Sequence, residues 1–265
     1  MKSYDNKIKY YELLMYYKDT SIYKKYSLPD GFHFEFYKEG NMSDWINIHI
    51  ESGEFCAIEE GIMIFHDFYD AFIQELNKRC IFIVDDKTNE KIGTATVSLL
   101  SKVEFGYNGA VDWVAIKKDY QGKGLAKPLI TKILETANKL EHKGIILHTQ
   151  TTTWLAAKLY LDFGFNILNK NEKNGWNILK TLTNHPKLNE FETLKAEEVY
   201  DKRNVEIEAQ LNQIFKDDNF NYSVWYKNGL HNVYVYYKNS TYEYEYFDYE
   251  NKIVLKEVEN KKYKR

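Results

Sequence analysis

Residues 110–126 read AVDWVAIKKDYQGKGLA, an apolar run that passes through polar residues into a loop with two glycines. Apolar residues at helical spacing follow, from Leu125 to Leu134. A strand that leads through a glycine loop into a helix forms a cradle for an anion, because the first N–H groups of the helix have no intrahelical partner and the helix dipole favours negative charge. Gly122 and Gly124 allow close approach of the backbone. The stretch therefore predicts a phosphate or pyrophosphate site.

The composition excludes several classes of protein. The chain has 265 residues, which is enough to bury a full core. Its formal net charge of −3 gives no overall electrostatic attraction to nucleic acid or membrane. No apolar run approaches the roughly 20 residues of a membrane helix, and residues 1–7 lack the apolar segment of a signal peptide. Cys56 and Cys80 match no disulfide framework and no metal spacing. We expect a cytoplasmic protein without a metal.

The N-terminal residues predict a helical extension. Tyr10, Leu13, Leu14 and Tyr17 recur at a weak helical period, and a turn signal at residues 28–31 ends the segment. We therefore expect residues 1–30 to form a helical extension. A first strand is expected at residues 32–37, where side chains alternate in character.

Residues 31–184 are expected to form one domain of mixed α and β structure, of class α/β (α+β). Helices are expected near residues 43–48 and over residues 62–78. The remaining expected strands lie at residues 81–84, 92–100, 111–116, 144–149, 164–168 and 176–182, with helices from the glycine loop to about residue 140 and over residues 154–163. Antiparallel strands come first, and strand–helix units follow. This order predicts a mixed, mostly antiparallel sheet with flanking helices.

A smaller unit is expected at residues 187–265, after a boundary at residues 184–186. An amphipathic helix is predicted over residues 196–216. Four short strands follow at residues 222–226, 232–237, 242–249 and 252–258. Asn228-Gly229 predicts a hairpin turn between the first two of these strands. The unit is therefore expected to be a small α+β structure, a helix followed by an antiparallel meander.

Two common phosphate-binding loops fit the glycine loop poorly. The nucleoside triphosphate loop needs G-x-x-x-x-G-K-[ST], and the sequence contains no such string. The dinucleotide fingerprint needs G-x-G-x-x-G, but Lys127 stands where its third glycine belongs. The loop also follows antiparallel strands in the middle of the chain, whereas the fingerprint belongs to a first strand–helix unit. Neither of these two loop types therefore accounts for the glycine loop.

Residues 121–126, QGKGLA, match the pattern Q/R-x-x-G-x-G/A. This pattern resembles the signature of the N-acetyltransferase superfamily known as GNAT. The run Val114-Ala115-Ile116 precedes it at the distance that this family shows, and residues 159–165, LYLDFGF, resemble the family's later L-Y-x-x-x-G-F. Either motif alone is weak, but together, in the right order of strand and helix, they are specific. The resemblance covers residues 31–183 and implies a GNAT-like domain.

The resemblance implies acetyl-coenzyme A, or a related acyl-coenzyme A, as the acyl donor. Its pantetheine arm would run beside the strand that carries Val114, Ala115 and Ile116. Thr153 stands where the family often has an asparagine, and its hydroxyl can still bond coenzyme A. The pyrophosphate would lie on the loop that consists of Gln121, Gly122, Lys123, Gly124, Leu125 and Ala126.

The resemblance also implies direct attack of an amine on the thioester, without a covalent acyl-enzyme. Tyr160 stands where relatives place the general acid that protonates the leaving thiolate. A phenol with a pKa of about 10 is protonated at neutral pH and can donate. The alternative is that Tyr160 is only a packed helix tyrosine.

Asp112 is the best candidate for the general base. Alternation along its strand places it on the same face as Ala110 and Val114, and several relatives carry a histidine or an acid at this place. An aspartate between Val111 and Trp113 is costly to bury unless it is paired or functional. Water can replace a side-chain base in this family. Other acids that could serve are Glu54, Glu59 and Glu104.

The acceptor pocket is expected on the far side of the thioester. In this fold the segment after the first strand would shape the pocket through Trp45, Glu54 and Phe55. His148, at the end of a buried strand, would border it, or would be an ordinary histidine of the sheet. The acceptor itself is not identified by these residues. A small-molecule amine and a protein or peptide amine both stay open.

Three functions follow from these observations. The leading one is an acyl-coenzyme A-dependent N-acetyltransferase. The second is a coenzyme A-binding sensor or degenerate enzyme with a C-terminal interaction module. The third is a protein-lysine acetyltransferase in which residues 187–265 dock the partner by adding a strand. No nucleic-acid or membrane partner is expected, and a homodimer stays open.

Overall fold

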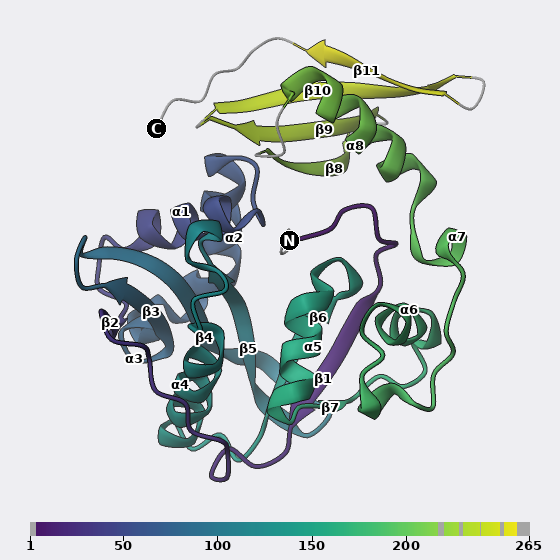
Figure 1. Ribbon diagram of the computed structural model, residues 1–265. Coiled ribbons are helices and arrows are strands. Elements are labelled where there is room, and N and C mark those ends of the chain that lie inside the picture. The colour runs from purple at the N-terminus through teal and green to yellow at the C-terminus, as the bar shows by residue number, and fades with distance from the viewer. Residues whose placement is uncertain (1–3, 217–219, 228–229, 239, 250–251, 259–265) are drawn as a thin grey trace.

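The protein contains two β-sheets with helices around them (Figure 1). The computed structural model describes residues 4–216, 220–227, 230–238, 240–249 and 252–258. Within these residues the larger sheet has seven strands in the order β2-β3-β4-β5-β6-β1-β7, and the smaller has four in the order β11-β10-β9-β8. No helix in this part of the chain has the length and apolar character needed to cross a membrane.

The larger sheet is mixed and mostly antiparallel, as predicted. Its strands are β1 (Glu12–Tyr17), β2 (Phe32–Phe36), β3 (Cys80–Asp85), β4 (Glu90–Glu104), β5 (Tyr107–Ile116), β6 (Ile145–Gln150) and β7 (Asn166–Ile167). Only β5 and β6 pair in parallel among these strands; each other neighbouring pair is antiparallel. The fold class expected from the order of the elements is therefore confirmed.

Helices cover both faces of this sheet. They are α1 (Met42–Ser52), α2 (Ile58–Tyr69), α3 (Leu76–Arg79), α4 (Ala126–Lys139), α5 (Trp154–Phe163) and α6 (Lys173–Thr183), with short 3₁₀ segments η1 (Asp70–Glu75), η2 (Lys118–Tyr120), η3 (Thr151–Thr153) and η4 (Pro186–Leu188). In β3, Ile81 and Ile83 belong to the core under α4 and α5, whereas Phe82 belongs to the core under α1 and α2. Because both faces are covered, β3 is an almost continuous apolar run.

The predicted N-terminal helix is wrong. Residues 12–17 form β1, which pairs with β6 on one side and β7 on the other. Leu13 and Met15 are fully buried and Leu14 is only partly so, which is the period of two that a strand requires. The backbone hydrogen-bonding groups along the edge of β6 need a partner strand, and this requirement outweighs the weak helical period of the N-terminal residues. The described part of residues 1–30 therefore does not form a helical extension, since residues 12–17 lie inside the main sheet.

Three further boundaries differ from the prediction. Residues 176–182, expected as a strand, lie in α6, where Trp176 and Leu179 are buried three residues apart on one helical face. The helix expected over residues 62–78 breaks into α2, η1 and α3, because Phe72 leaves helical geometry at φ −143°. The helix expected over residues 196–216 is two helices, as Tyr200 is extended and Asp201 caps a new start.

The smaller unit has its own core. It consists of α7 (Ala196–Val199), α8 (Lys202–Phe215), β8 (Asn221–Lys227), β9 (Leu230–Tyr237), β10 (Ser240–Tyr249) and β11 (Lys252–Val258). Leu211 of α8 packs with Val233 and Tyr244 of the sheet. The expected helix and antiparallel sheet are thus present, and the hairpin turn predicted at Asn228-Gly229 lies outside the described residues.

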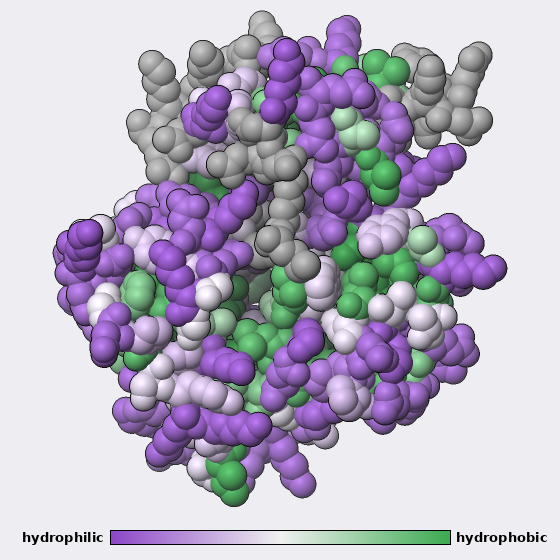
Figure 2. All heavy atoms as spheres, in the orientation of Figure 1, coloured by the Kyte–Doolittle hydropathy of each residue, from purple (hydrophilic) through white to green (hydrophobic). Residues whose placement is uncertain are grey.

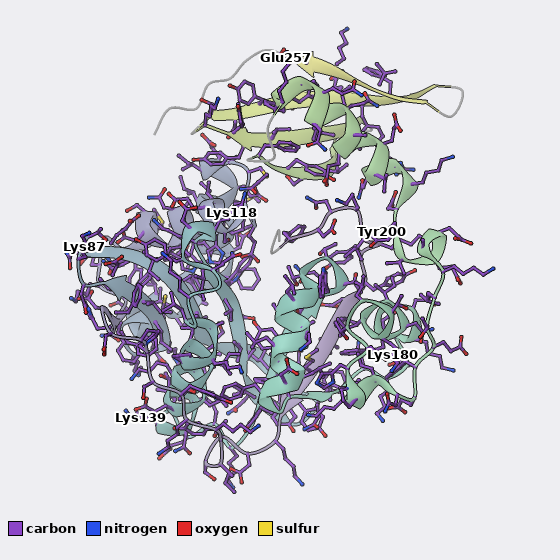
Figure 3. The ribbon with its side chains drawn as sticks, in the orientation of Figure 1. Lys87, Lys118, Lys139, Lys180, Tyr200 and Glu257 are labelled. Atoms are coloured by element: carbon purple, nitrogen blue, oxygen red, sulfur yellow. The ribbon has the colours of Figure 1, made fainter. Side chains whose placement is uncertain are left out.

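The N-terminal segment joins the two units. It runs between the C-terminal sheet and the main sheet (Figure 1). The N–H of Asp5 donates to the carbonyl of Thr152 at 2.8 Å, and Lys7 forms an ion pair with Glu208 of α8 at 2.9 Å. Ile8 bridges to Tyr200, which lies between α7 and α8 and is labelled in Figure 3. The segment therefore holds the C-terminal unit against the main domain.

Candidate active site

The site begins where β5 leaves β6. The two strands pair only at Ala110–Ile146 and Val111–Leu147. Beyond this point Trp113 has φ +54°, and the register between β4 and β5 shifts. A residue in left-handed geometry that adds one position to a strand makes a bulge, which bends the strand away from its neighbour. The bulge at Trp113 therefore opens the sheet between β5 and β6.

A cavity of about 270 Å³ occupies this opening. Apolar residues gather in a hollow at the centre of the face shown in Figure 2. One wall of the cavity is the diverging part of β5, and the other is formed by the end of β6, η3 and α5. Its lining is Tyr4, Ser52, Glu54, Val111, Trp113, Val114, Ala115, Ile116, Gln121, Ala126, Ile130, Leu147, His148, Thr149, Gln150, Thr153, Leu155, Ala156, Leu159 and Tyr160.

The glycine loop enters α4 beside this cavity. Gly122 and Gly124 have φ +76° and +81°, a left-handed geometry that favours glycine. A Cβ on Gly122 would meet no described atom within 4 Å, and one on Gly124 would meet only Pro29, at 3.8 Å. No side chain of the described residues caps α4. The loop and the first turn of α4 thus leave open space and donor N–H groups for an anion, which fits the predicted pyrophosphate.

Side chains around the loop fix its position. Gln121 donates from Nε2 to the carbonyl of Ile116 at 2.9 Å, which ties the loop to the end of β5. Lys117 is buried and pairs with Glu51, at 3.1 Å, and with Glu90. These carboxylates face a second, larger cavity of about 540 Å³ between the loop and the C-terminal sheet. The charge of Lys117 is therefore balanced by protein carboxylates at the base of the loop.

Two lysines of the loop region lie over aromatic rings. The ammonium of Lys123 is 4.3 Å from the ring centroid of Tyr120, and that of Lys127 is 5.3 Å from the ring centroid of Tyr26. Each contact is a cation–π interaction that holds the ammonium near the loop. Lys118, labelled in Figure 3, lies at the end of β5 that faces the C-terminal unit. The loop therefore offers positive charge near its open donor groups.

Tyr160 of α5 lines the cavity and is 6% exposed. Its ring packs against Phe165 with the centroids 5.6 Å apart. Burial raises the pKa of Tyr160 above its ordinary value, and the negative charge of Glu54 raises it further. The phenol is thus protonated at neutral pH and lies where a proton donor could reach a ligand in the cavity.

The structure brings most of the other predicted residues to the cavity. Val114, Ala115 and Ile116 form its β5 wall, and Thr153 and His148 form part of the opposite wall. The hydroxyl of Thr153 donates to the carbonyl of Gln150 at 3.2 Å. His148 holds the carboxylate of Glu12 at 2.8 Å. Their roles toward a ligand stay predictions.

Trp45, Phe55 and Asp112, predicted for the acceptor pocket and as the general base, do not line the cavity. Trp45 and Phe55 are completely or almost completely buried in the aromatic core under α1 and α2. Asp112 pairs with Thr96 across the sheet, and burial raises the pKa of its carboxyl group. The bulge at Trp113 explains why: it breaks the alternation that placed Asp112 on the face of Val114. Asp112 as the base stays a prediction, without contact to the cavity.

Sequence analysis missed two residues of the acceptor side. Tyr4 reaches the cavity from the N-terminal segment. No local sequence pattern predicts this position, because the other lining residues are far from Tyr4 in the sequence. His49 stands behind Glu54, with its Nδ1 2.6 Å from Glu54 Oε2. Its spacing from Glu54 is five residues; only the turn after α1 brings the two side chains together. The described His, Cys, Asp and Glu residues form no group of three or more that could hold a metal ion.

A family model matches part of the main domain. Residues 44–165 match the model of the Acetyltransferase (GNAT) family. The strand, the glycine loop and every lining residue of the cavity except Tyr4 lie within this range. Over these residues the chain is similar to a GNAT acetyltransferase domain, and a C-terminal β-rich unit is present in addition.

A solved structure of low sequence identity has the same fold. A GCN5-related N-acetyltransferase from Sphaerobacter thermophilus is 12% identical, with a TM-score of 0.50 over 62% of this chain and 50% of that chain. A GNAT-family acetyltransferase from Colwellia psychrerythraea is 12% identical, with a TM-score of 0.46 over 61% of this chain and 55% of that chain. The match thus spans about half the length of these structures. No protein among the curated ones matches the sequence.

Proposed function

We propose that this protein is an N-acetyltransferase that moves an acetyl group from acetyl-coenzyme A to an amine by direct attack. The observation that carries the proposal is the position of Tyr160, a protonated phenol inside a cavity that opens between β5 and β6 next to the glycine loop. A coenzyme A-binding sensor has no need of a proton donor there.

Different groups along the cavity act on different parts of acetyl-coenzyme A. The open N–H groups of the loop and of the first turn of α4 bind the pyrophosphate. The free backbone edge of β5 at Val114, Ala115 and Ile116 pairs with the amides of the pantetheine arm. Acetyl-coenzyme A supplies the activated acyl group. Tyr160 then gives its proton to the sulfur as the carbon–sulfur bond breaks.

The test is binding and transfer measured on the full chain. Calorimetry with acetyl-coenzyme A is expected to show binding, and incubation with a panel of small primary amines is expected to release free coenzyme A thiol and an acetylated amine. Binding without transfer to any amine of the panel would favour the sensor instead. Absence of binding would contradict both.

Gly124→Ala is expected to weaken acetyl-coenzyme A binding by at least about tenfold, or about 1.4 kcal/mol. Alanine disfavours the φ of +81° at this position, and its methyl group enters the space before the loop. Gly40→Ala is the control, because Gly40 has φ +91° and open space for a Cβ but lies before α1. Calorimetry measures both. Equal losses would show that backbone strain alone, and no anion site, explains the effect.

A further inference from the structure

Glu54 and His49 form a carboxylate–imidazole pair at the acceptor side of the cavity. Glu54 lines the cavity and its side chain is 27% exposed, whereas that of His49 is 0% exposed. Only Glu54 Oε2 is engaged: it lies 2.6 Å from His49 Nδ1, and no other hydrogen bond from the described residues reaches this carboxylate. One carboxylate oxygen is thus held from behind while the other can meet a ligand.

The surroundings of His49 give it a single partner. Its ring lies among three aromatic rings, with centroid distances of 4.3 Å to Trp45, 5.0 Å to Phe55 and 5.5 Å to Trp113. Its Nε2 is buried and has no hydrogen-bond partner among the described residues. Since a carboxylate only accepts, Nδ1 carries the hydrogen in this contact. A buried ring nitrogen without a partner costs free energy, so packing alone does not account for a histidine here.

The turn that carries Glu54 is fixed from two sides. Gly53 ends α1 at φ +96°, and the N–H of Glu54 donates to the carbonyl of His49 at 2.9 Å. From the C-terminal unit, Asn221 donates to the carbonyl of Ile50 at 3.3 Å. Thr241 donates to the carbonyl of Cys56 at 2.7 Å, on the other side of Glu54. The C-terminal sheet therefore braces the turn that presents Glu54 to the cavity.

We infer that Glu54 is the general base of the transfer reaction, that His49 is its positioning residue, and that the acceptor is an amine that arrives as an ammonium ion. The inference rests on the proposed function. It departs from the sequence-based candidate, because Glu54 lines the cavity and Asp112 does not.

The proton balance uses both cavity acids. Glu54 takes one proton from the ammonium, which frees the nitrogen lone pair. The nitrogen bonds to the acetyl carbon, the carbon–sulfur bond breaks, and the sulfur receives the proton of Tyr160. The new amide nitrogen loses its second proton to the Tyr160 phenolate, and Glu54 releases its proton to solvent. The titratable groups that act on Glu54 from neighbouring elements are His49, Tyr4, Glu60 and Tyr160.

Two probe amines separate a base from a structural residue. Benzylamine is protonated at neutral pH and needs a base, whereas aniline is already neutral. Glu54→Gln is expected to lower kcat/KM for benzylamine by about 100-fold and to affect aniline far less, with acetyl-coenzyme A binding unchanged. Raising the pH until benzylamine is neutral should restore much of the loss. Glu39→Gln, at an exposed position between β2 and α1, is the matched control and should change neither rate.

His49 is tested with a variant that keeps the ring and removes the donor. His49→Phe is expected to lower kcat for benzylamine with little change in KM for acetyl-coenzyme A, and to show the same recovery at high pH. His49→Gln retains a donor and should recover part of the activity. Nitrogen NMR of the full chain with labelled histidine is expected to show the hydrogen on Nδ1 of His49, and Glu54→Gln should change that signal.

Three results would overturn the inference. Equal loss for both amines in Glu54→Gln would make the residue structural. Loss confined to benzylamine in Asp112→Asn, but absent in Glu54→Gln, would make Asp112 the base while the proposed function stands. A wild-type protein that binds acetyl-coenzyme A but acetylates neither these probes nor any other amine would defeat the proposed function and, with it, the role of Glu54.

Discussion

Tyr160→Phe is expected to lower kcat by about 100-fold and to leave the affinity for acetyl-coenzyme A nearly unchanged. Loss of one positioned proton donor slows a reaction by two to four orders of magnitude as a rough rule. The substitution removes only the hydroxyl, so the ring can keep its packing against Phe165. Steady-state release of coenzyme A gives kcat, and calorimetry gives the affinity.

The pH profile of kcat of the wild-type protein tests the same role. An acid is active in its protonated form, and burial followed by the charge of Glu54 raises the pKa of Tyr160. We therefore expect no alkaline loss of kcat from this group below the ordinary tyrosine pKa of about 10. An alkaline loss below that pH which disappears in Tyr160→Phe would contradict the raised pKa.

Tyr17→Phe is the matched control. Tyr17 also packs against Phe165, with centroids 5.1 Å apart, and its hydroxyl donates to the carbonyl of Ile22 at 3.0 Å. It does not line the cavity. The two variants thus remove one hydroxyl each from the same aromatic neighbourhood. If both lower kcat equally, Tyr160 has no special role in proton transfer.

The geometry of the glycine loop could be predicted because its signals are local. The strand, Gly122, Gly124 and the first turn of α4 follow one another within a short stretch, and their geometry depends on neighbours in the sequence. The same holds for the antiparallel strands of the C-terminal unit, where the alternation of side chains predicts the strands and which residues share a face of the sheet. Local patterns therefore gave these parts of the fold correctly.

Asp112 shows where such patterns stop. Its predicted face depends on strict alternation along β5, and Trp113 interrupts that alternation with a positive φ. A tryptophan in left-handed geometry is an exception that only the surrounding structure can stabilise. The bulge opens the cavity and at the same time takes Asp112 away from its lining. No local sequence pattern therefore predicts the bulge that opens the cavity.

The acceptor side depends on contacts between distant residues. Glu54 was expected in the pocket, but its partner His49 becomes visible only when the turn at Gly53 is known. That turn is braced by Asn221 and Thr241, which lie far away in the sequence. Single-sequence patterns cannot show which of several glutamates is held in this way, because exposure and pairing are properties of the folded chain.

Leu13→Ala is expected to lower the free energy of unfolding by about 3 kcal/mol. Leu13 is fully buried in β1, between β6 and β7. The helix above it lies so close that a Cβ on Gly175 would meet Leu13 Cδ2 at 2.8 Å. Truncation therefore leaves a void at the centre of the domain. Had residues 1–30 formed a helix outside the sheet, the same change would cost little. Urea denaturation followed by circular dichroism measures the loss.

Leu14→Ala serves as the control, because Leu14 is the next residue of β1 and only partly buried on the opposite face. Its loss should be about 1 kcal/mol or less. Equal losses for the two leucines would argue against an internal strand. A larger loss for Leu13 has a functional consequence as well, since β1 pairs with the whole of β6 and so supports His148 and Thr149 on the cavity wall. Destabilisation of β1 should therefore reduce acetyl-coenzyme A binding at temperatures near the unfolding midpoint before it does so at low temperature.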